Sequence, residues 1–267
     1  MTVCKTANAR HPALALMVAL MVALMAALAA VSPGSQAQAQ TAATCNARAG
    51  SSVAPVVELY TSEGCNSCPP ADRWLSRLKA DSSVVALAFH VDYWDRLGWK
   101  DRFASPAYTQ RQGQEQARNG ARFSYTPQVV VDGADRKDWS GIDTDLAAKA
   151  RAVAKVELSL VREGERFIAL VQAAAGAPAQ LAAYWAVTEQ GHVTAVKAGE
   201  NEGVTLKHDF VVREYKPVAA WAAPSGSPVA LQFSPSATAS PGHVRQVNLV
   251  VVDAVSGKPV QALKLGC

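Results

Sequence analysis

Three largely apolar runs mark the first half of the chain, at residues 56–60, 84–89 and 128–132. Runs of this length without polar alternation are typical of strands that are buried on both faces. Pro69 and Pro70 favour a helix start, so we expect a helix over residues 71–78 and a β-α-β unit across the first two runs. The pattern therefore predicts an α/β domain over residues 55–153.

Two further helices are predicted within this domain. Ser105-Pro106 and Asn119-Gly120 are start and stop signals, and because the residues between them are polar on most sides, we expect this inserted helix to lie on the surface. Asp143 or Thr144 is predicted to cap a helix that runs to about residue 153.

The pattern changes after residue 154. Short β-type runs follow one another, separated by Gly, Pro or polar turns, at residues 155–162, 167–173, 181–188, 192–197, 209–215, 229–233, 244–252 and 259–265. No helical period competes with them. This spacing predicts an all-β, sandwich-like domain over residues 154–267. The glycine-rich residues 199–203 lack the lysine and the flanking elements of a phosphate loop, so they are predicted to form a turn.

The N-terminus has the pattern of a signal peptide. Lys5 and Arg10 precede an uncharged run over residues 12–31, and Ala37-Gln38-Ala39 offers small residues for cleavage before Gln40. We expect residues 1–39 to be removed and residues 40–54 to form an N-terminal extension. The alternative is a retained membrane anchor. Either outcome places the rest of the chain outside the cytoplasm, in the periplasm or secreted.

Charge adds little to this picture. The chain has 26 Lys and Arg against 22 Asp and Glu, and loss of Lys5 and Arg10 with the leader leaves 24 against 22, or +2. No basic cluster remains that would indicate nucleic acid as a partner. The cysteines are more informative. Four of the five follow the leader, and an even number in an oxidising compartment is consistent with fully paired thiols.

Cys65 and Cys68 form a C-x-x-C pair where the first apolar run meets the predicted helix. A helix N-terminus favours thiolate over thiol, and thiolate is the nucleophile in disulfide exchange. We expect Cys65 to be the exposed attacking thiol and Cys68 the buried resolving one. Elimination then pairs Cys45 with Cys267 in a structural disulfide.

The residues around this pair resemble those of a known family. Residues 58–72, with His90-Val91-Asp92-Tyr93-Trp94-Asp95 and residues 97–101, are similar to a thioredoxin-like family of secreted bacterial proteins of unassigned function, domain of unknown function family 1223. The resemblance implies a thioredoxin-like fold for residues 55–153 and export of the protein. It also implies that Thr126-Pro127 is a cis bond facing the cysteines and holding the substrate chain.

Several nearby side chains have two interpretations. Glu58 resembles the buried acid that assists proton transfer in thioredoxins, or it is an edge or surface residue. His90 is an acid-base group or metal ligand, or a hydrogen-bonded structural residue. Tyr93, Trp94 and Trp99 form an aromatic lid that recognises substrate, or they seal the joint between the inserted helix and the sheet.

Two classes of function follow. The first is an exported thiol-disulfide oxidoreductase that needs no cofactor beyond its redox-active disulfide and acts on protein thiols or disulfides of the cell envelope, with no membrane attachment after leader cleavage. The second is a non-enzymatic binding protein, such as a copper chaperone using Cys65, Cys68 and His90. We favour the first and expect no bound metal.

Overall fold

The structure is a computed structural model that describes residue 1 and residues 45–144, 146 and 151–267. The predicted leader, the start of the predicted extension and most of the helix expected between residue 143 and residue 153 lie outside these residues. Ala43–Cys267 form a single unit by their internal contacts.

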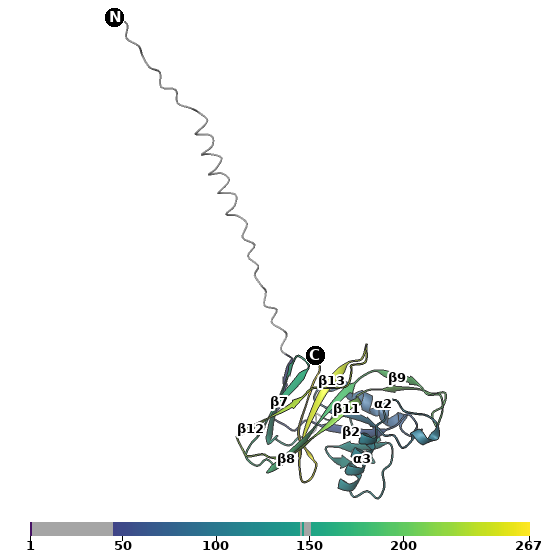
Figure 1. Ribbon diagram of the computed structural model, residues 1–267. Helices are drawn as coiled ribbons and strands as arrows, with labels where there is room; N and C mark the ends of the chain where they lie inside the picture. Colours follow the sequence, from purple (N-terminus) through teal and green to yellow (C-terminus); the bar gives the residue numbers. More distant parts are fainter. Residues whose placement is uncertain (2–44, 145, 147–150) are drawn as a thin grey trace. The chain divides into compact units, whose positions relative to one another are not determined.

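The main feature of the fold is one eight-stranded sheet, seen in Figure 1. Its strands, in spatial order, are β14 (Pro259–Leu265), β13 (Arg245–Asp253), β8 (Gln180–Glu189), β11 (Val211–Ala222), β3 (Val85–His90), β2 (Val56–Thr61), β4 (Gln128–Val131) and β5 (Ala134–Asp135). β3 is parallel to β2 and to β11, and every other neighbouring pair is antiparallel. Strands from the two halves of the sequence therefore share one sheet.

This arrangement overturns the predicted fold class, an α/β thioredoxin-like domain followed by an all-β domain. β11 pairs with β3 through Val211 and Ala88, so the second half of the chain continues the sheet of the first. The physical reason is that β3 would otherwise present an open edge, and a strand buried on both faces needs a partner on each side. The protein is a mainly β structure built around this mixed sheet.

A second sheet packs on the part of the large sheet that carries β8, β13 and β14. It has four antiparallel strands, in the order β1 (Asn46–Arg48), β6 (Val156–Glu163), β7 (Arg166–Ala173) and β12 (Pro228–Phe233). Inward-facing side chains such as Leu158, Leu160, Trp185 and Leu249 are fully buried between the sheets. Trp185 stacks on Phe233, with ring centroids 5.2 Å apart.

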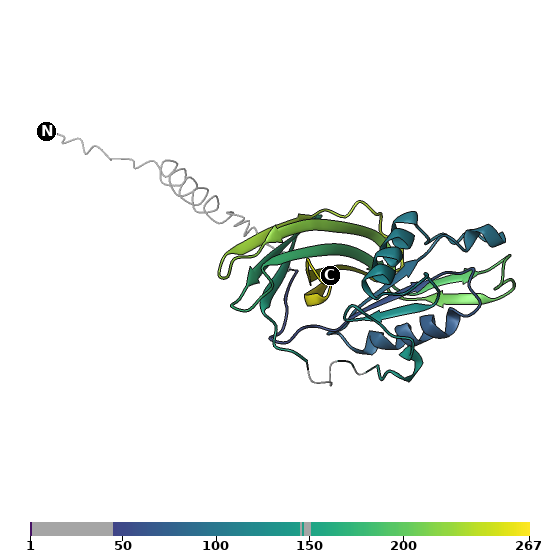
Figure 2. The ribbon, with the colours of Figure 1, turned by 90° about the horizontal axis from the view of Figure 1, so that it is seen from below.

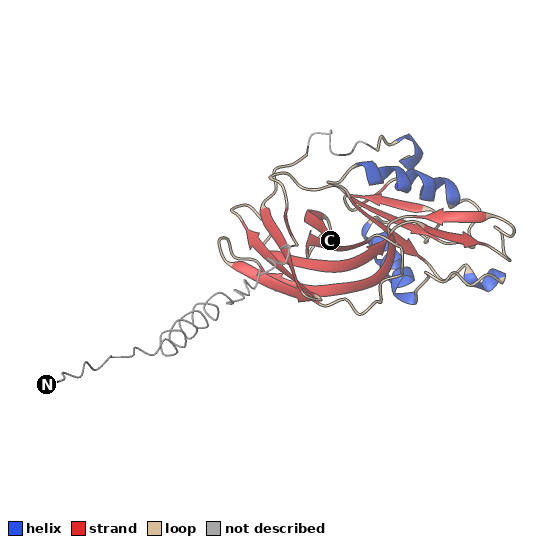
Figure 3. Ribbon diagram, turned by 90° about the horizontal axis from the view of Figure 1, so that it is seen from above, coloured by secondary structure: helices blue, strands red, loops and turns tan. Residues whose placement is uncertain are grey.

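Two α-helices cover opposite faces of the other part of the large sheet, as Figure 2 shows. α2 (Pro69–Arg77) buries Trp74 and Leu75 against β2 and β3. α3 (Pro106–Arg118) begins at Ser105, whose hydroxyl accepts a hydrogen bond from the Ala107 amide, and packs Tyr108 on the other face. Short 3-10 turns are η1 (Leu78–Ala80), η2 (Asp95–Leu97) and η3 (Trp139–Gly141). Figure 3 shows that the helices gather at one end of the strands.

The inserted helix α3 lies on the surface, with residues such as Gln110 and Gln114 exposed, but it also buries a polar face against the sheet. Arg111, Gln112 and Glu115 are buried on this face, because each has a polar partner. The partners are Glu58 on β2 for Arg111, Gln128 on β4 for Gln112, and Arg118 of the same helix for Glu115. A short antiparallel hairpin lies beside α2 and consists of β9 (His192–Ala195) and β10 (Thr205–His208). Among the described residues, no helix is both long enough and apolar enough to span a membrane.

Candidate functional site

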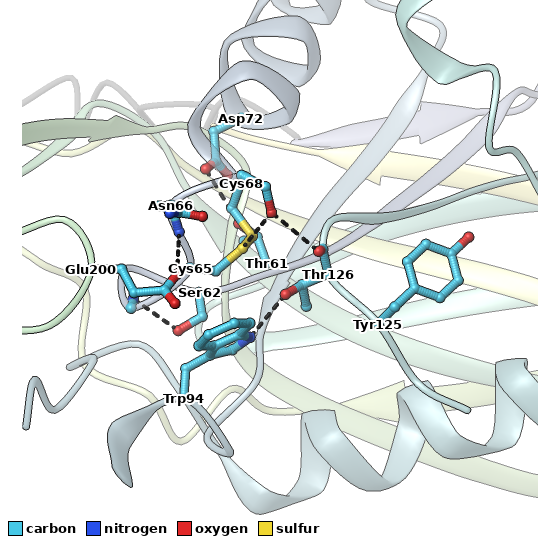
Figure 4. Close-up of a disulfide and its surroundings, with 12 residues drawn as sticks. Thr61, Ser62, Cys65, Asn66, Cys68, Asp72, Trp94, Tyr125, Thr126 and Glu200 are labelled. Carbon is cyan, nitrogen blue, oxygen red and sulfur yellow. Dashed lines mark hydrogen bonds between the residues drawn. A yellow bond between two sulfur atoms is a disulfide. The ribbon is translucent and has the colours of Figure 1, made fainter. Parts of the chain in front are cut away.

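Cys65 and Cys68 form a disulfide where β2 gives way to α2, with their Cα atoms 5.4 Å apart (Figure 4). Two successive turns prepare this geometry, since the Cys65 amide donates to the Ser62 carbonyl and the Cys68 amide to the Cys65 carbonyl. Gly64 precedes the pair, and a Cβ there would come within 3.0 Å of the Trp94 Cβ. Glycine is therefore needed for Trp94 to approach the disulfide.

The expected exposure of Cys65 is wrong for this oxidised form. Cys65 and Cys68 are both 0% exposed, whereas Asn66 and Ser67 between them are exposed. Cys65 does lie at the N-terminal end of the helix, but segments distant in sequence fold over it. The disulfide is a buried group with two exposed residues in its loop.

Thr126 and Pro127 lie on one side of the disulfide, and the bond between them is cis. The Ser67 hydroxyl lies 3.3 Å from the Cys65 sulfur and 3.4 Å from the Thr126 carbonyl oxygen, so it connects the dithiol loop with this segment. Trp94 donates from its indole nitrogen to the Thr126 hydroxyl at 2.8 Å (Figure 4). Trp94 and Thr126 therefore meet beside the disulfide.

A loop from the second half of the chain, residues 199–203, also covers Cys65. The Asn201 side-chain amide donates to the carbonyl oxygens of Glu63 and Cys65, both at 2.9 Å. Glu200 accepts a hydrogen bond from the Asn66 amide at 3.1 Å. The sequence predicts only a turn here, since a lone asparagine between glycines carries no signal of a distant partner.

Five buried titratable side chains lie behind the disulfide. Asp72, one helical turn after Cys68, accepts a hydrogen bond from the Thr61 hydroxyl at 3.2 Å. The His208 ring reaches it from β10, with Nδ1 4.0 Å from the Asp72 carboxylate and Nε2 3.4 Å from Glu63. Burial raises the pKa of Asp72, and the nearby histidines only partly offset this effect.

His90 and Asp101 complete this group, which we call the α2-side cluster: Glu63, Asp72, His90, Asp101 and His208. His90 Nδ1 lies 2.7 Å from the Asp101 carboxylate, and the two histidine rings are 5.0 Å apart. Burial opposes a charge on His90, but the adjacent Asp101 carboxylate raises the pKa of His90 above its ordinary value. Burial likewise disfavours the Asp101 carboxylate, yet His90 holds its pKa at about 2.

Glu58 is not part of this cluster. Val57 and Leu59 on β2 face α2, so strand alternation turns Glu58 to the opposite face. There it is buried in an ion pair with Arg111 and accepts hydrogen bonds from Tyr60 and Tyr184. Burial alone would raise the pKa of Glu58, but Arg111 and the two hydroxyls lower it. The predicted proton-transfer role therefore has no geometric basis, and neither does the surface alternative.

The other aromatic candidates divide between two positions. Trp99 donates from its indole nitrogen to Glu63 at 2.8 Å, which ties it to the α2-side cluster. Tyr93 packs against the core beneath α3 and contacts Trp94, with ring centroids 6.2 Å apart. His90 is fully buried, so it presents no surface to a bound substrate. Of the four predicted substrate-binding residues, Trp94 is the one whose hydrogen bond joins it to the segment beside the disulfide.

The copper-chaperone alternative gains nothing from this geometry. Across the described residues 45–144, 146 and 151–267, no group of three or more His, Cys, Asp or Glu has an arrangement that could hold a metal ion. His90 directs Nδ1 to Asp101 and packs its ring against His208 and Phe103.

A second disulfide joins Cys45 to Cys267, with Cα atoms 6.1 Å apart. It links the segment that leads into β1 with the end of the chain after β14. This is the partner that elimination assigned to each cysteine, and it lies at the two-sheet end of the protein, away from α2.

Fold and site together define a mainly β protein with a buried C-x-x-C disulfide at a strand-to-helix junction. The chain belongs to the family described as a protein of unknown function, DUF1223, which it matches over residues 56–252. It is similar to a crystal structure of a protein from Agrobacterium tumefaciens, with 30% identity and a TM-score of 0.61 over 81% of this chain and 96% of that chain.

A more distant likeness concerns the fold alone. HBP35 of Porphyromonas gingivalis superposes with a TM-score of 0.56 at 14% identity, covering 81% of this chain and 76% of that chain. No curated protein matches the chain.

Proposed function

We propose that this protein is an exported thiol-disulfide oxidoreductase whose reactive group is the Cys65–Cys68 disulfide. The observation that carries the proposal is the disulfide at the start of α2 with the buried acid Asp72 one helical turn later. Burial raises the pKa of Asp72. A buried carboxyl group with a raised pKa can exchange a proton with a thiol, which disulfide exchange requires at the resolving cysteine.

In the oxidising direction, a substrate thiolate attacks the Cys65 sulfur, the Cys65–Cys68 bond breaks, and Cys68 leaves as a thiolate. In the proposed reaction, Asp72 supplies the proton that Cys68 then takes up. A second substrate thiolate attacks the substrate sulfur of the mixed disulfide and releases Cys65. Two substrate thiols lose two electrons to form one disulfide, and Cys65 and Cys68 gain them as two thiols. The reducing direction is the reverse.

The expected partners are protein thiols or disulfides of the cell envelope, and the expected location is the periplasm or the exterior. Support for export is the leader pattern of residues 1–39 together with two disulfides, which persist in oxidising compartments. The redox group is the disulfide itself, so no dissociable cofactor is needed.

Trapping tests the proposal directly. Cys68→Ala should capture partner proteins as mixed disulfides on Cys65, whereas Cys65→Ala should capture none, because only the first variant retains the attacking thiol. Alkylation of the reduced protein against pH should show Cys65 titrating below the usual thiol value of about 8.5. If neither variant traps a partner in the cell envelope, the disulfide is structural.

The reduction potential then gives the direction of transfer. Equilibration with glutathione and dithiothreitol buffers would distinguish an oxidant, near about −120 mV, from a reductant, near about −270 mV. A potential well below about −300 mV, the range of inert structural disulfides, would contradict the proposal.

A further inference from the structure

Because the disulfide is buried, the protein must open before any exchange reaction can occur. Cys65 and Cys68 are both 0% exposed, and the attacking thiolate must reach the Cys65 sulfur. Some segment above the disulfide must therefore move before exchange occurs. Three segments are candidates: Trp94 with its turn, the Thr126–Pro127 segment, and residues 199–203.

Residues 199–203 form the loop at the tip of a two-stranded hairpin, whose strands are anchored by buried side chains such as Leu206 and His208. β9 and β10 pair with each other and, within the described part of the chain, with no third strand. Thr126, by contrast, leads directly into β4, which is paired on both sides in the large sheet, with β2 and with β5. Segments with few tertiary hydrogen bonds open at the lowest free-energy cost, so we take the loop at the tip of the hairpin as the part that opens.

Few contacts hold the loop of this hairpin closed over Cys65. Asn201 is 5% exposed and its amide spans two backbone carbonyls, those of Glu63 and Cys65. Glu200 adds a hydrogen bond from the Asn66 amide, but both residues are exposed, so water competes with this contact. Gly199 and Gly203 bound the loop with φ of +78° and +80°, a left-handed conformation that glycine adopts readily.

We propose that residues 199–203 are a latch over the dithiol and that Asn201 is the positioning residue that closes it. The inference rests on the proposed function and adds its regulation: Cys65 reacts only in the minor, open form, so a protein substrate must displace the latch as it docks. The same amide fixes the carbonyls of Glu63 and Cys65, which orients the turn that carries the attacking sulfur.

The test measures how fast dithiothreitol reduces each disulfide of the oxidised protein. Two dithiothreitol thiols lose two electrons and close into a cyclic disulfide, while Cys65 and Cys68 become thiols. Quenching with an alkylating agent and mapping the labelled peptides follows the two disulfides separately. Cys45–Cys267 then serves as an internal reference, because Cys267 is exposed and no part of the latch touches it.

Asn201→Ala should accelerate reduction of Cys65–Cys68 by about tenfold, the effect expected when the closed form loses two ordinary hydrogen bonds and attack follows the open population. Reduction of Cys45–Cys267 should not change. Glu200→Ala changes an exposed residue, so it should not unfold the protein. It should accelerate reduction of Cys65–Cys68 by about two- to threefold. Hydrogen exchange should show faster exchange at residues 199–203 in Asn201→Ala.

Asn119→Ala is the matched control. Asn119 also spans two backbone carbonyls, those of Glu115 and Gly133, but at the end of α3. It should leave the Cys65–Cys68 rate within about twofold of wild type even if it lowers stability equally. Equal rates in wild type and both latch variants would overturn the proposal, and so would the same acceleration in Asn119→Ala.

This assay separates the latch from the function beneath it. Access of a small thiol to the disulfide does not depend on any natural partner. If Asn201→Ala accelerates reduction while Cys68→Ala traps no protein, the latch stands and the oxidoreductase proposal fails. If trapping succeeds and the rates do not change, the latch alone is wrong.

Discussion

The two faces of β2 each bury carboxylates, but in opposite ways. On the α3 face, Glu58 pairs with Arg111 and accepts hydrogen bonds from Tyr60 and Tyr184. Arg111 also lies over the Tyr184 ring, 4.1 Å from its centroid. A charge that is compensated from several sides is fixed in one protonation state, and the lowered pKa of Glu58 agrees with this. This face contributes structure.

The α2-side cluster is less completely paired. Among the described residues Nε2 of His90 has no hydrogen-bond partner, and His208 makes only long contacts, at 3.4 Å to Glu63 and 4.0 Å to Asp72. Burial raises the pKa of Asp72, so the fold favours its protonated form. The comparison shows that a buried acid indicates chemistry only where its charge is not already balanced.

The largest effect should come from breaking the α3-face pair. Arg111→Ala leaves Glu58 buried without its counter-charge, which should lower the free energy of unfolding by about 3 to 5 kcal/mol. Urea denaturation measures this loss. Arg151→Ala removes the partially exposed Arg151–Asp132 pair and should cost no more than about 1 kcal/mol. The potential of Cys65–Cys68 should stay the same, and a shift in Arg111→Ala would mean that the faces are coupled.

Local signals in the sequence predicted the dithiol region well. The strand before Cys65, the helix that begins at Pro69 and the helix between Ser105 and Asn119 depend on nearby residues, and the structure places them within a few residues of the predicted bounds. The continuous sheet was not predictable in this way. Strand patterns indicate which faces are buried, but they do not say that β11 pairs with β3.

The residues of the site also differ in whether the sequence nearby could predict them. Asp72 had a usable signal, because it lies four residues after Cys68 and so on the same face of the helix. Strand alternation also contained the information that Glu58 and Thr61 face opposite sides. Asn201 had none, since its partners are 136 and 138 residues away in sequence. Functional contacts formed by a loop far along the chain require the structure.

The next prediction concerns Asp72. Asp72→Asn preserves size but cannot exchange a proton, so disulfide exchange with a protein substrate should slow roughly a hundredfold. Stability at pH 7 should not fall, because the raised pKa shows that the fold disfavours the charged carboxylate. Stopped-flow exchange rates against pH provide the measurement. Glu58→Gln is the matched control, and it should change stability while leaving the exchange rate within about twofold.

An unchanged rate in Asp72→Asn, with the disulfide intact by mass spectrometry, would remove the acid from the mechanism. A slowed exchange rate in Glu58→Gln, measured where this variant is fully folded, would remove the distinction between the two faces of β2. Each result affects a different part of the comparison.

The smallest effect should be a pH dependence that belongs only to the α2-side cluster. Asp101, Asp72, Glu63 and His208 are the titratable groups that face His90. The pKa of His90 is raised above 6.5, so its stabilisation is fully present below pH 6.5 and is lost as the pH rises through the raised value. The pKa of Asp101 is lowered from 3.8 to about 2, so its stabilisation is present above pH 3.8 and lost as the pH falls through about 2.

The free energy of unfolding should therefore decrease as the pH rises from 6.5 through the raised pKa of His90, by roughly 1.5 kcal/mol, the lower end of the net contribution of a hydrogen bond to a charged group. Urea denaturation across this range measures the slope. His90→Gln should flatten it, since the remaining side chain does not titrate. Glu58→Gln should keep it, because Arg111 stays charged throughout. If both variants keep the slope, the alkaline loss has another source, and the His90–Asp101 pair is as fixed in its charge as the pair on the α3 face.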